Sequence, residues 1–198
     1  MLERDLVEVL ERADLAARWD FALASDEAYS ELWFDEPPAS ALQVSDRRQV
    51  VAFQTLSKRS SMTGYRSGFV AAAPDVIAAL KAFRPTVGTA PQEFVQRASI
   101  VAWDDEEHVA RARETYRRKR EILMGALERR GFRLAGSRAG MYLWVEMPAD
   151  VVPRLLEHGV VVSPGGFFGP SGAGYVRFAL VPTEEECRRA AEILEEVL

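Results

Sequence analysis

Apolar residues recur every three to four positions along the first 18 residues of the chain. Leucine, valine and alanine occupy positions 2, 6, 9, 10, 13 and 17, and charged residues lie between them. This spacing predicts an amphipathic helix over residues 2–18. Three shorter apolar runs follow, and we predict each as a strand. Residues 20–25 suit a buried strand, and residues 49–56 and 67–73 suit strands that are buried on both faces. A helix followed by such strands indicates an α/β fold.

Helical patterns dominate the middle of the chain. They predict helices over residues 75–83, 91–103 and about 105–130. The third segment carries many arginines among acidic residues. We interpret it as a solvent-exposed helix face with ion pairs between neighbouring turns, and not as a basic binding patch.

The last third of the chain alternates short apolar runs with turns. A closing helix is predicted from Thr183, because Thr183 and Glu186 have the spacing of a capping box. The glycine-rich stretch over residues 163–174 lacks the strand–loop–helix context of a phosphate loop, so we expect a flexible connection there. The other predicted elements are strands over residues 132–136, 141–147, 160–166 and 174–181 and a short helix over 151–158. These predict a smaller α+β unit.

Composition and charge exclude several classes of function. The chain has 25 basic and 30 acidic side chains, a net charge of -5 and a pI near 5.3, so nothing favours binding to nucleic acid or to an anionic membrane. One cysteine, Cys187, allows no internal disulfide, and with only His108 and His158 beside it we expect no metal site. No apolar run reaches the length of a membrane span and the first residues do not resemble a leader peptide, so we expect a cytoplasmic protein.

Lysine is rare in this chain, and one lysine has unusual neighbours. Only Lys58, Lys81 and Lys119 occur, and Lys58 lies in the stretch TLSKRSSMTGYRSG. An amine that attacks an aldehyde must be unprotonated, which requires burial or a neighbouring cation. Arg66 is a candidate for that cation, and its planar guanidinium would also suit a phosphate group. From these residues alone, an ordinary surface lysine remains the alternative.

The pattern S-K-x(5)-G-x-R-x-G in this stretch resembles the lysine motif of the class I and II aminotransferases, enzymes of fold type I that use pyridoxal 5'-phosphate (PLP). Two other stretches match the same family in the same order. SDEAY places Asp26 and Tyr29 three residues apart after a predicted strand, and GYVRFAL places Arg177 on a late strand. The segments KRSSMTGYRSGFVAA, VQRASIVAWDDEEHV and GYVRFALV are most similar to the succinyldiaminopimelate aminotransferases within this family.

The resemblance implies a role toward the cofactor ring for three residues. Lys58 would bind PLP covalently and carry a proton between the substrate and the cofactor. Asp26 would keep the pyridine nitrogen protonated, which makes the ring an electron sink. Tyr29 would donate a hydrogen bond to the phenolate oxygen of the ring.

Three further residues would hold charged groups of the ligands. Arg66 and Thr55 would bind the cofactor phosphate, and Arg177 would form a bidentate pair with the α-carboxylate of the substrate. The implied substrates are an amino acid and a 2-oxo acid, with N-succinyl-diaminopimelate and 2-oxoglutarate as the pair used in lysine biosynthesis. Ordinary loop, core and strand roles remain the alternatives for Asp26, Tyr29 and Arg177.

The resemblance covers only a C-terminal portion of the family pattern. Residues 1–109 match the second part of the PLP-binding large domain, and residues 110–198 match the small domain. The phosphate loop, the stacking aromatic and the Asn-Pro-x-x-Pro-Thr-Gly stretch of the family do not occur here. We therefore expect either a homodimer or a complementing N-terminal half. A non-catalytic remnant, an interaction module, or another aminotransferase or β-lyase specificity stays open.

Overall fold

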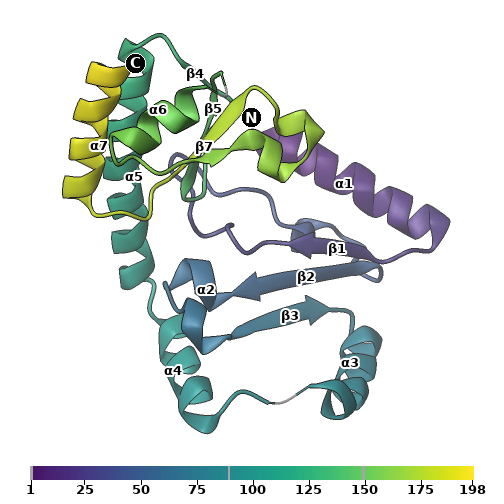
Figure 1. The fold of residues 1–198 in the computed structure, drawn as a ribbon. Helices are drawn as coiled ribbons and strands as arrows, with labels where there is room; N and C mark the ends of the chain where they lie inside the picture. The colour runs from purple at the N-terminus through teal and green to yellow at the C-terminus, as the bar shows by residue number, and fades with distance from the viewer. Residues whose placement is uncertain (1, 89, 149) are drawn as a thin grey trace. The chain divides into compact units, whose positions relative to one another are not determined.

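The structure is a computed structural model that describes residues 2–88, 90–148 and 150–198, with side chains from residue 6 onward. The chain divides into two compact units, Met1–Ala112 and Arg113–Leu198 (Figure 1). The functional identities predicted for residues 1–109 and 110–198, a large-domain part and a small domain, stay predictions. No helix among the described residues is long and apolar enough to cross a membrane.

The first unit is built on a three-stranded sheet with the order β1-β2-β3. Its strands are β1 (Leu23–Asp26), β2 (Val50–Thr55) and β3 (Gly68–Ala72). β1 and β2 are parallel, whereas β2 and β3 are antiparallel. The predicted first helix is confirmed as α1 (Leu2–Trp19), and its buried Ala13 packs with residues of β2 and of the connection before it.

The prediction that these strands are buried on both faces is wrong for the described structure. Val50 and Ala52 are buried, but Phe53 is 42% exposed and Phe69 is 44% exposed. Successive side chains of a strand point to opposite faces, and the register pairs Phe53 with Val70 but Phe69 with Gln54. The two exposed rings therefore lie on opposite faces, so neither face of the sheet is fully covered within this unit. Phe69 gains partial cover from Trp103, whose ring centroid lies 4.9 Å away.

Short and long helices complete the first unit. A single helical turn, α2 (Leu56–Arg59), follows β2 directly. The three helices predicted from the middle of the chain are confirmed as α3 (Pro74–Val87), α4 (Glu93–Asp104) and α5 (Glu107–Arg129). α5 begins in the first unit and continues into the second.

The second unit is an antiparallel sheet with the order β4-β5-β7-β6 and two further helices. The strands are β4 (Arg133–Leu134), β5 (Tyr142–Glu146), β6 (Ser163–Pro164) and β7 (Tyr175–Ala179), and the helices are α6 (Val151–Glu157) and α7 (Glu184–Val197). The predicted capping box of α7 is confirmed, because the Thr183 hydroxyl accepts from the Glu186 amide at 3.2 Å and the Glu186 carboxylate accepts from the Thr183 amide at 2.7 Å.

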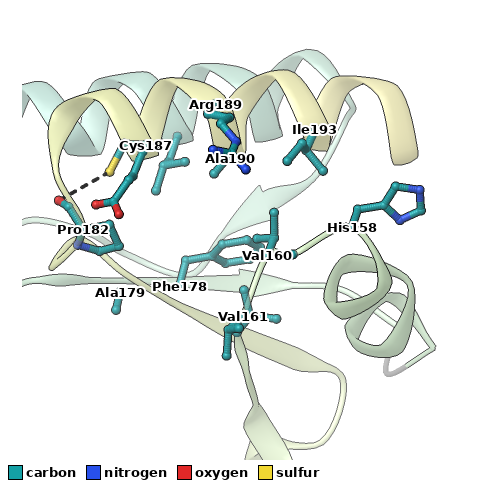
Figure 2. A pocket seen from close by; sticks show the side chains of 14 residues that line it. His158, Val160, Val161, Phe178, Ala179, Pro182, Cys187, Arg189, Ala190 and Ile193 are labelled. Carbon is teal, nitrogen blue, oxygen red and sulfur yellow. Dashed lines mark hydrogen bonds between the residues drawn. The ribbon is translucent and has the colours of Figure 1, made fainter.

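Alternation along β5 and β7 builds the core of this unit. Leu143, Val145, Val176 and Phe178 are buried, and the residues between them are less so. α5 and α7 lie side by side, joined by ion pairs of Arg118 with Glu184 and of Arg129 with Glu195. These ion pairs show that the arginine-rich segment is an ion-paired helix surface, as predicted. Figure 2 shows Phe178 of the core beneath α7.

One prediction for the second unit needs correction. The strand expected over residues 160–166 is reduced to the two residues of β6, and Val161 is 79% exposed. The glycine-rich connection joins β6 to β7 and contains two 3₁₀ turns, Gly165–Phe168 and Pro170–Gly172, while its expected flexibility stays a prediction. These turns touch so closely that a Cβ on Gly165 would come within 2.1 Å of the Gly172 carbonyl oxygen, a distance that only glycine allows.

Candidate active site

Polar residues gather where two parallel strands of the first unit end. Asp26 is the last residue of β1, and Thr55 is the last residue of β2. Lys58 follows within α2, the turn into which β2 leads. Parallel strands present their carboxyl ends at one edge of the sheet, and ligands of α/β proteins bind beyond that edge. The fold therefore places the predicted cofactor residues at the edge where such a ligand would bind.

Lys58 and Tyr29 are brought into direct contact. The Lys58 ammonium nitrogen Nζ lies 5.5 Å from the centroid of the Tyr29 ring, within the range of a cation–π contact. Lys58 is half-buried, and among the residues that the structure describes its Nζ makes no hydrogen bond or ion pair. Packing against an aromatic ring thus holds the amine without consuming its hydrogen-bonding capacity.

Asp26 is exposed, and its own loop orients its carboxylate. Oδ1 accepts a hydrogen bond from the Ala28 backbone amide at 3.1 Å, a local turn contact. A carboxylate oxygen has more than one acceptor position, so this bond leaves capacity for a ligand. Asp26 can therefore accept from a protonated ring nitrogen without losing the contact that orients it.

Thr55 has a structural role in addition to the predicted one. Its hydroxyl oxygen accepts from the Ser57 amide at 3.1 Å, which caps α2, and its hydroxyl lies 3.2 Å from the Ser67 carbonyl, to which it can donate. Arg66 is exposed in the left-handed region, with a φ of 54°, and its Nη1 donates to the Thr63 carbonyl at 3.1 Å. The remaining guanidinium donors of Arg66 are available to an anion, whereas the Thr55 hydroxyl is already engaged.

Arg177 lies in the second unit, on β7, between two aromatic rings. Its guanidinium carbon is 4.3 Å from the ring centroids of both Tyr142 and Phe168. Nη2 lies 3.5 Å from the Ser163 hydroxyl oxygen. Stacking restricts a planar guanidinium without occupying its N–H donors, so Arg177 is suited to bidentate binding of a carboxylate. Phe168 comes from the glycine-rich connection, and the sequence reasoning missed it because it treated that segment as flexible.

The sequence reasoning also missed a buried arginine beside Lys58. Arg59 is only 2% exposed, and its Nη1 donates to the Ala102 carbonyl at 2.6 Å. Nη2 forms an ion pair with Glu106. The Arg59 guanidinium also lies over the Trp103 ring, 5.1 Å from its centroid. Nothing in the local sequence distinguishes this arginine from its exposed counterparts.

His108 connects the start of α5 to the residue that follows α2. Its Nε2 lies 2.8 Å from the Ser60 hydroxyl oxygen, and its Nδ1 lies 3.0 Å from Asp105 Oδ2. Because the carboxylate accepts from Nδ1, a neutral His108 carries its proton there and accepts from Ser60 through Nε2. The His108 backbone amide also donates to the Asp105 carboxylate at 3.2 Å. This hydrogen bond lowers the pKa of the Asp105 carboxyl below its usual value, although burial acts in the opposite direction.

Glu27 is a buried carboxylate next to Asp26, again without a signal in the sequence. It accepts from the Ser40 hydroxyl and the Ala41 amide, both at 2.9 Å, and from the Gln54 side-chain amide at 3.2 Å. Hydrogen bonds to neutral donors allow a buried carboxylate to remain in the core. This network fixes the chain directly after β1 and so supports the position of Asp26.

A cavity of about 320 Å³ in the second unit contains none of the predicted site residues (Figure 2). It lies between α7 and the sheet, and Val160, Phe178 and Ile193 line it. Cys187 is buried in its wall, where its thiol lies 3.9 Å from the Pro182 carbonyl, and burial raises the pKa of that thiol. His158 at the rim contacts the Arg154 carbonyl at 2.9 Å. The wall of the cavity is mixed, since Glu186 and Arg189 line it beside the apolar residues, and it contains none of the residues predicted for the chemistry.

The residues at the strand ends fit the functional groups of PLP. The amine of Lys58 suits the aldehyde, the carboxylate of Asp26 suits the pyridine nitrogen and the phenol of Tyr29 suits the ring oxygen. The half-buried position of Lys58, with its Nζ packed on the Tyr29 ring, is the observation that carries this fit. No cluster of three or more metal-ligating side chains is found in the described part of the chain.

Comparison with known proteins gives the family. Residues 4–194 match the profile of the aminotransferase class I and II family. The chain is 39% identical over 175 residues to a probable aminotransferase of Mycobacterium tuberculosis, covering 85% of this chain and 42% of that protein. It is 37% identical over 188 residues to the LL-diaminopimelate aminotransferase of Aquifex aeolicus, covering 90% of this chain and 49% of that protein.

A solved structure extends the likeness to three dimensions. The structure of a probable N-succinyldiaminopimelate aminotransferase from Thermus thermophilus matches with a TM-score of 0.88 and 30% identity, over 98% of this chain and 54% of that chain. The predicted α/β class and its assignment to PLP fold type I are therefore confirmed. The chain spans about half the length of the curated relatives it matches.

Proposed function

The chain belongs to the class I and II aminotransferase family, and from this premise we propose that it forms the Lys58-bearing part of a PLP-dependent aminotransferase. The enzymes of this family depend on PLP, which supplies an electron sink for the electrons of the substrate α-carbon. The half-buried amine of Lys58, packed on Tyr29 at the carboxyl ends of β1 and β2, is the observation that carries the proposal.

Each residue at the strand ends then has a chemical task. Lys58 Nζ would hold the cofactor and would also be the base that moves the proton at the substrate α-carbon. Asp26 holds a proton on the pyridine nitrogen, because a fixed carboxylate stabilises the positive charge there. Tyr29 would donate a hydrogen bond from its hydroxyl to the ring oxygen, while its aromatic ring packs against Lys58.

The charged ends of the ligands are assigned to the two arginines. Arg66 binds the cofactor phosphate through the guanidinium donors that Thr63 does not use, with a smaller contribution from Thr55. Arg177 binds the substrate α-carboxylate, because its stacked guanidinium loses little freedom on pairing. These assignments make the substrates an amino acid and a 2-oxo acid.

For the amino acid we propose a diaminopimelate derivative, with 2-oxoglutarate as the second substrate. The support is the names of two proteins similar to this chain, an LL-diaminopimelate aminotransferase and a probable N-succinyldiaminopimelate aminotransferase. Such a reaction would belong to lysine biosynthesis in the cytoplasm. Turnover is assigned to an assembly that supplies the rest of the family's large domain, either as a complementing half or through a homodimer.

The cofactor-binding step can be tested on the chain itself. PLP is added to the purified chain, trapped with borohydride and located by peptide mass spectrometry, with Lys58→Ala and the matched variant Lys81→Ala as comparisons. We expect Lys58 to be labelled at least about tenfold faster than Lys81 and Lys119, because a generic surface amine lacks the surrounding site. Lys58→Ala should lose this fast phase, while Lys81→Ala should keep it.

Equal labelling of the three lysines would contradict the proposal. It would favour the second candidate, a non-catalytic module with the same fold. The exposed Phe53 and Phe69 on the sheet favour that candidate as an interaction module, since they offer aromatic surface to a partner.

A further inference from the structure

We propose that Arg59 is a positioning residue for Lys58, acting by anchoring the one-turn helix α2 to the junction between α4 and α5. The proposal rests on the proposed function of Lys58 as the PLP-binding lysine. Lys58 and Arg59 are adjacent in a helix of only four residues, Leu56–Arg59. Any displacement of Arg59 therefore displaces the backbone from which Lys58 projects.

A helix of one turn cannot hold its own conformation. Helix nucleation is unfavourable, and isolated helices shorter than about 12 residues are marginal in water. α2 must therefore take its position from contacts at its ends and along its sides. Thr55 caps its beginning through the Ser57 amide at 3.1 Å, and the end depends on Arg59 and Ser60.

Arg59 supplies the first anchor of that end. Nη1 donates to the Ala102 carbonyl at 2.6 Å in the last turn of α4, and Nη2 pairs with Glu106 just before α5. The guanidinium is stacked over Trp103. These contacts span 43 and 47 residues of sequence, so they join two distant segments of the first unit.

Ser60 supplies the second anchor, one residue beyond the helix. Its hydroxyl oxygen lies 2.8 Å from His108 Nε2, and His108 is held through Nδ1 by Asp105 at 3.0 Å. Asp105 Oδ1 also accepts from the Glu107 amide at 2.8 Å, at the start of α5. His108, which accepts from the Ser60 hydroxyl, is thus fixed to the junction between α4 and α5, where the partners of Arg59 also lie.

The energetics of Arg59 favour a role in positioning over a role in bulk stability. A fully buried guanidinium loses its hydration, and an apolar side chain of similar volume often stabilises a core as well or better. The Arg59 Nε is buried without a hydrogen-bond partner among the described residues, and its nearest carboxylate oxygen, on Glu31, is 3.8 Å away. A group that is costly to bury but makes directional contacts fixes geometry more effectively than it adds free energy.

The experiment compares the full wild-type chain with Arg59→Met, Arg59→Lys and His108→Ala. Arg97→Met is the matched control, since Arg97 pairs with Glu93 at 2.6 Å on the exposed surface of α4. Each protein is labelled with trace acetic anhydride, without cofactor, and separately with PLP and borohydride. Peptide mass spectrometry gives the labelling of Lys58 relative to exposed Lys81 in the same sample.

Loss of the Arg59 contacts should change the labelling of Lys58 relative to Lys81 in both experiments, acetylation and PLP trapping. The change should be seen at temperatures well below the melting temperature. In Arg59→Met we expect Lys58 acetylation to rise about threefold as α2 loosens. PLP trapping at Lys58 should fall about tenfold, because a small misplacement of a reacting group is costly. Arg59→Lys keeps a cation near Glu106, so it should recover part of the PLP trapping at Lys58. His108→Ala should change both labelling ratios in the same direction as Arg59→Met, but less. Arg97→Met should match the wild type.

A purely structural Arg59 would give a different result. The melting temperature would fall in Arg59→Met while both Lys58 ratios stayed at their wild-type values, and this would overturn the proposal. If Arg59→Met does not fold, an unchanged acetylation ratio in folded His108→Ala overturns it as well. Absence of a PLP preference for Lys58 in the wild type would refute the proposed function instead, and the acetylation ratio would still decide whether Arg59 positions α2.

Discussion

The sheets of the two units differ in how each one covers its apolar residues. In the second unit, Leu143, Val145, Val176 and Phe178 form one buried face, and Figure 2 shows α7 over it. In the first unit, β2 alternates in the same way, but the side opposite its buried residues carries the exposed Phe53. Both sheets obey the same two-residue period, so the difference lies in what packs against them.

The two units therefore differ in what they contribute, one a closed core and the other most of the residues of the proposed chemistry. The second unit closes its core with its own helices, and Arg177 on its β7 is stacked against Tyr142 and Phe168. The first unit carries Lys58, Asp26 and Tyr29 beside a sheet that is incompletely covered, since Phe53 and Phe69 are exposed on its opposite faces. The chain matches about half the length of its relatives, so additional sequence in those proteins is available to cover such a face. We therefore expect mutations to affect the two sheets unequally.

The largest effect is expected from truncating the core of the second unit. Leu143→Ala should lower the free energy of unfolding by about 2–5 kcal/mol, because Leu143 is fully buried and its removal leaves a cavity. The measurement is urea unfolding, combined with hydrogen exchange to assign the loss to the second unit.

Phe53→Ala is the matched change in the first unit. Phe53 is a larger side chain but is substantially exposed, so its loss should cost less than that of Leu143. A larger destabilisation by Phe53→Ala would mean that the face of the sheet that carries Phe53 is covered in solution, for example by a second copy of the chain. The concentration dependence of unfolding would then reveal the association.

A smaller effect, confined to the first unit, is expected from Gly68→Ala. A Cβ on Gly68 would lie 2.3 Å from the backbone carbonyl oxygen of Gln54, so β2 and β3 would have to separate. We expect a loss of about 1–3 kcal/mol, the usual cost of overpacking. Amide hydrogen exchange should accelerate in β2 and β3, while the second unit remains protected.

Gly64→Ala provides the control, because a Cβ at Gly64 would have no atom within 4 Å among the described residues. If Gly68→Ala were as mild as Gly64→Ala, the close pairing of Thr55 with Gly68 would not exist in solution. The end of β2 would then be less constrained than the contacts of Lys58 require.

Local patterns were sufficient to predict most elements but not their burial. α1, the three middle helices and the capping box of α7 follow from periodicity and cap spacing, which act within a few residues. The double burial of the strands and the strand over residues 160–166 were wrong. An apolar run does not specify which neighbour covers it, and the exposed Val161 shows that such a run can also leave the sheet.

In the candidate site, too, local motifs predicted some residues, whereas contacts between distant segments could not be predicted. Lys58 and Tyr29 were singled out by motif, and the structure places them in contact. Arg59 and His108 were missed because their partners lie more than 40 residues away in sequence, and only the folded chain brings them together. Phe168 was missed because glycine-rich sequence indicates conformational freedom, although here it forms close 3₁₀ turns.

The smallest expected effect is a change in stability as the pH falls, and it can be compared between one carboxylate of each unit, Glu186 and Asp46. The backbone hydrogen bond with Thr183, followed by the side-chain hydrogen bond, lowers the pKa of Glu186 below 4.5. The hydrogen bond with the Arg48 side chain lowers the pKa of Asp46 from 3.8 to about 2. Each carboxylate binds protons less readily in the folded state, so its stabilisation is complete above its ordinary pKa and is lost as the pH falls through the lowered value.

Glu186→Gln and Asp46→Asn remove these titrations while keeping a carbonyl acceptor at each position. The stability difference between wild type and Glu186→Gln, measured by urea unfolding, should begin to shrink as the pH falls below 4.5. For Asp46→Asn the difference should begin to shrink only below 3.8 and persist toward about 2. Both groups are exposed, so high salt should reduce both differences. A Glu186→Gln difference that stayed constant from neutral to acid pH would show that the cap of α7 acts through its hydrogen bonds alone, with no contribution from the carboxylate charge.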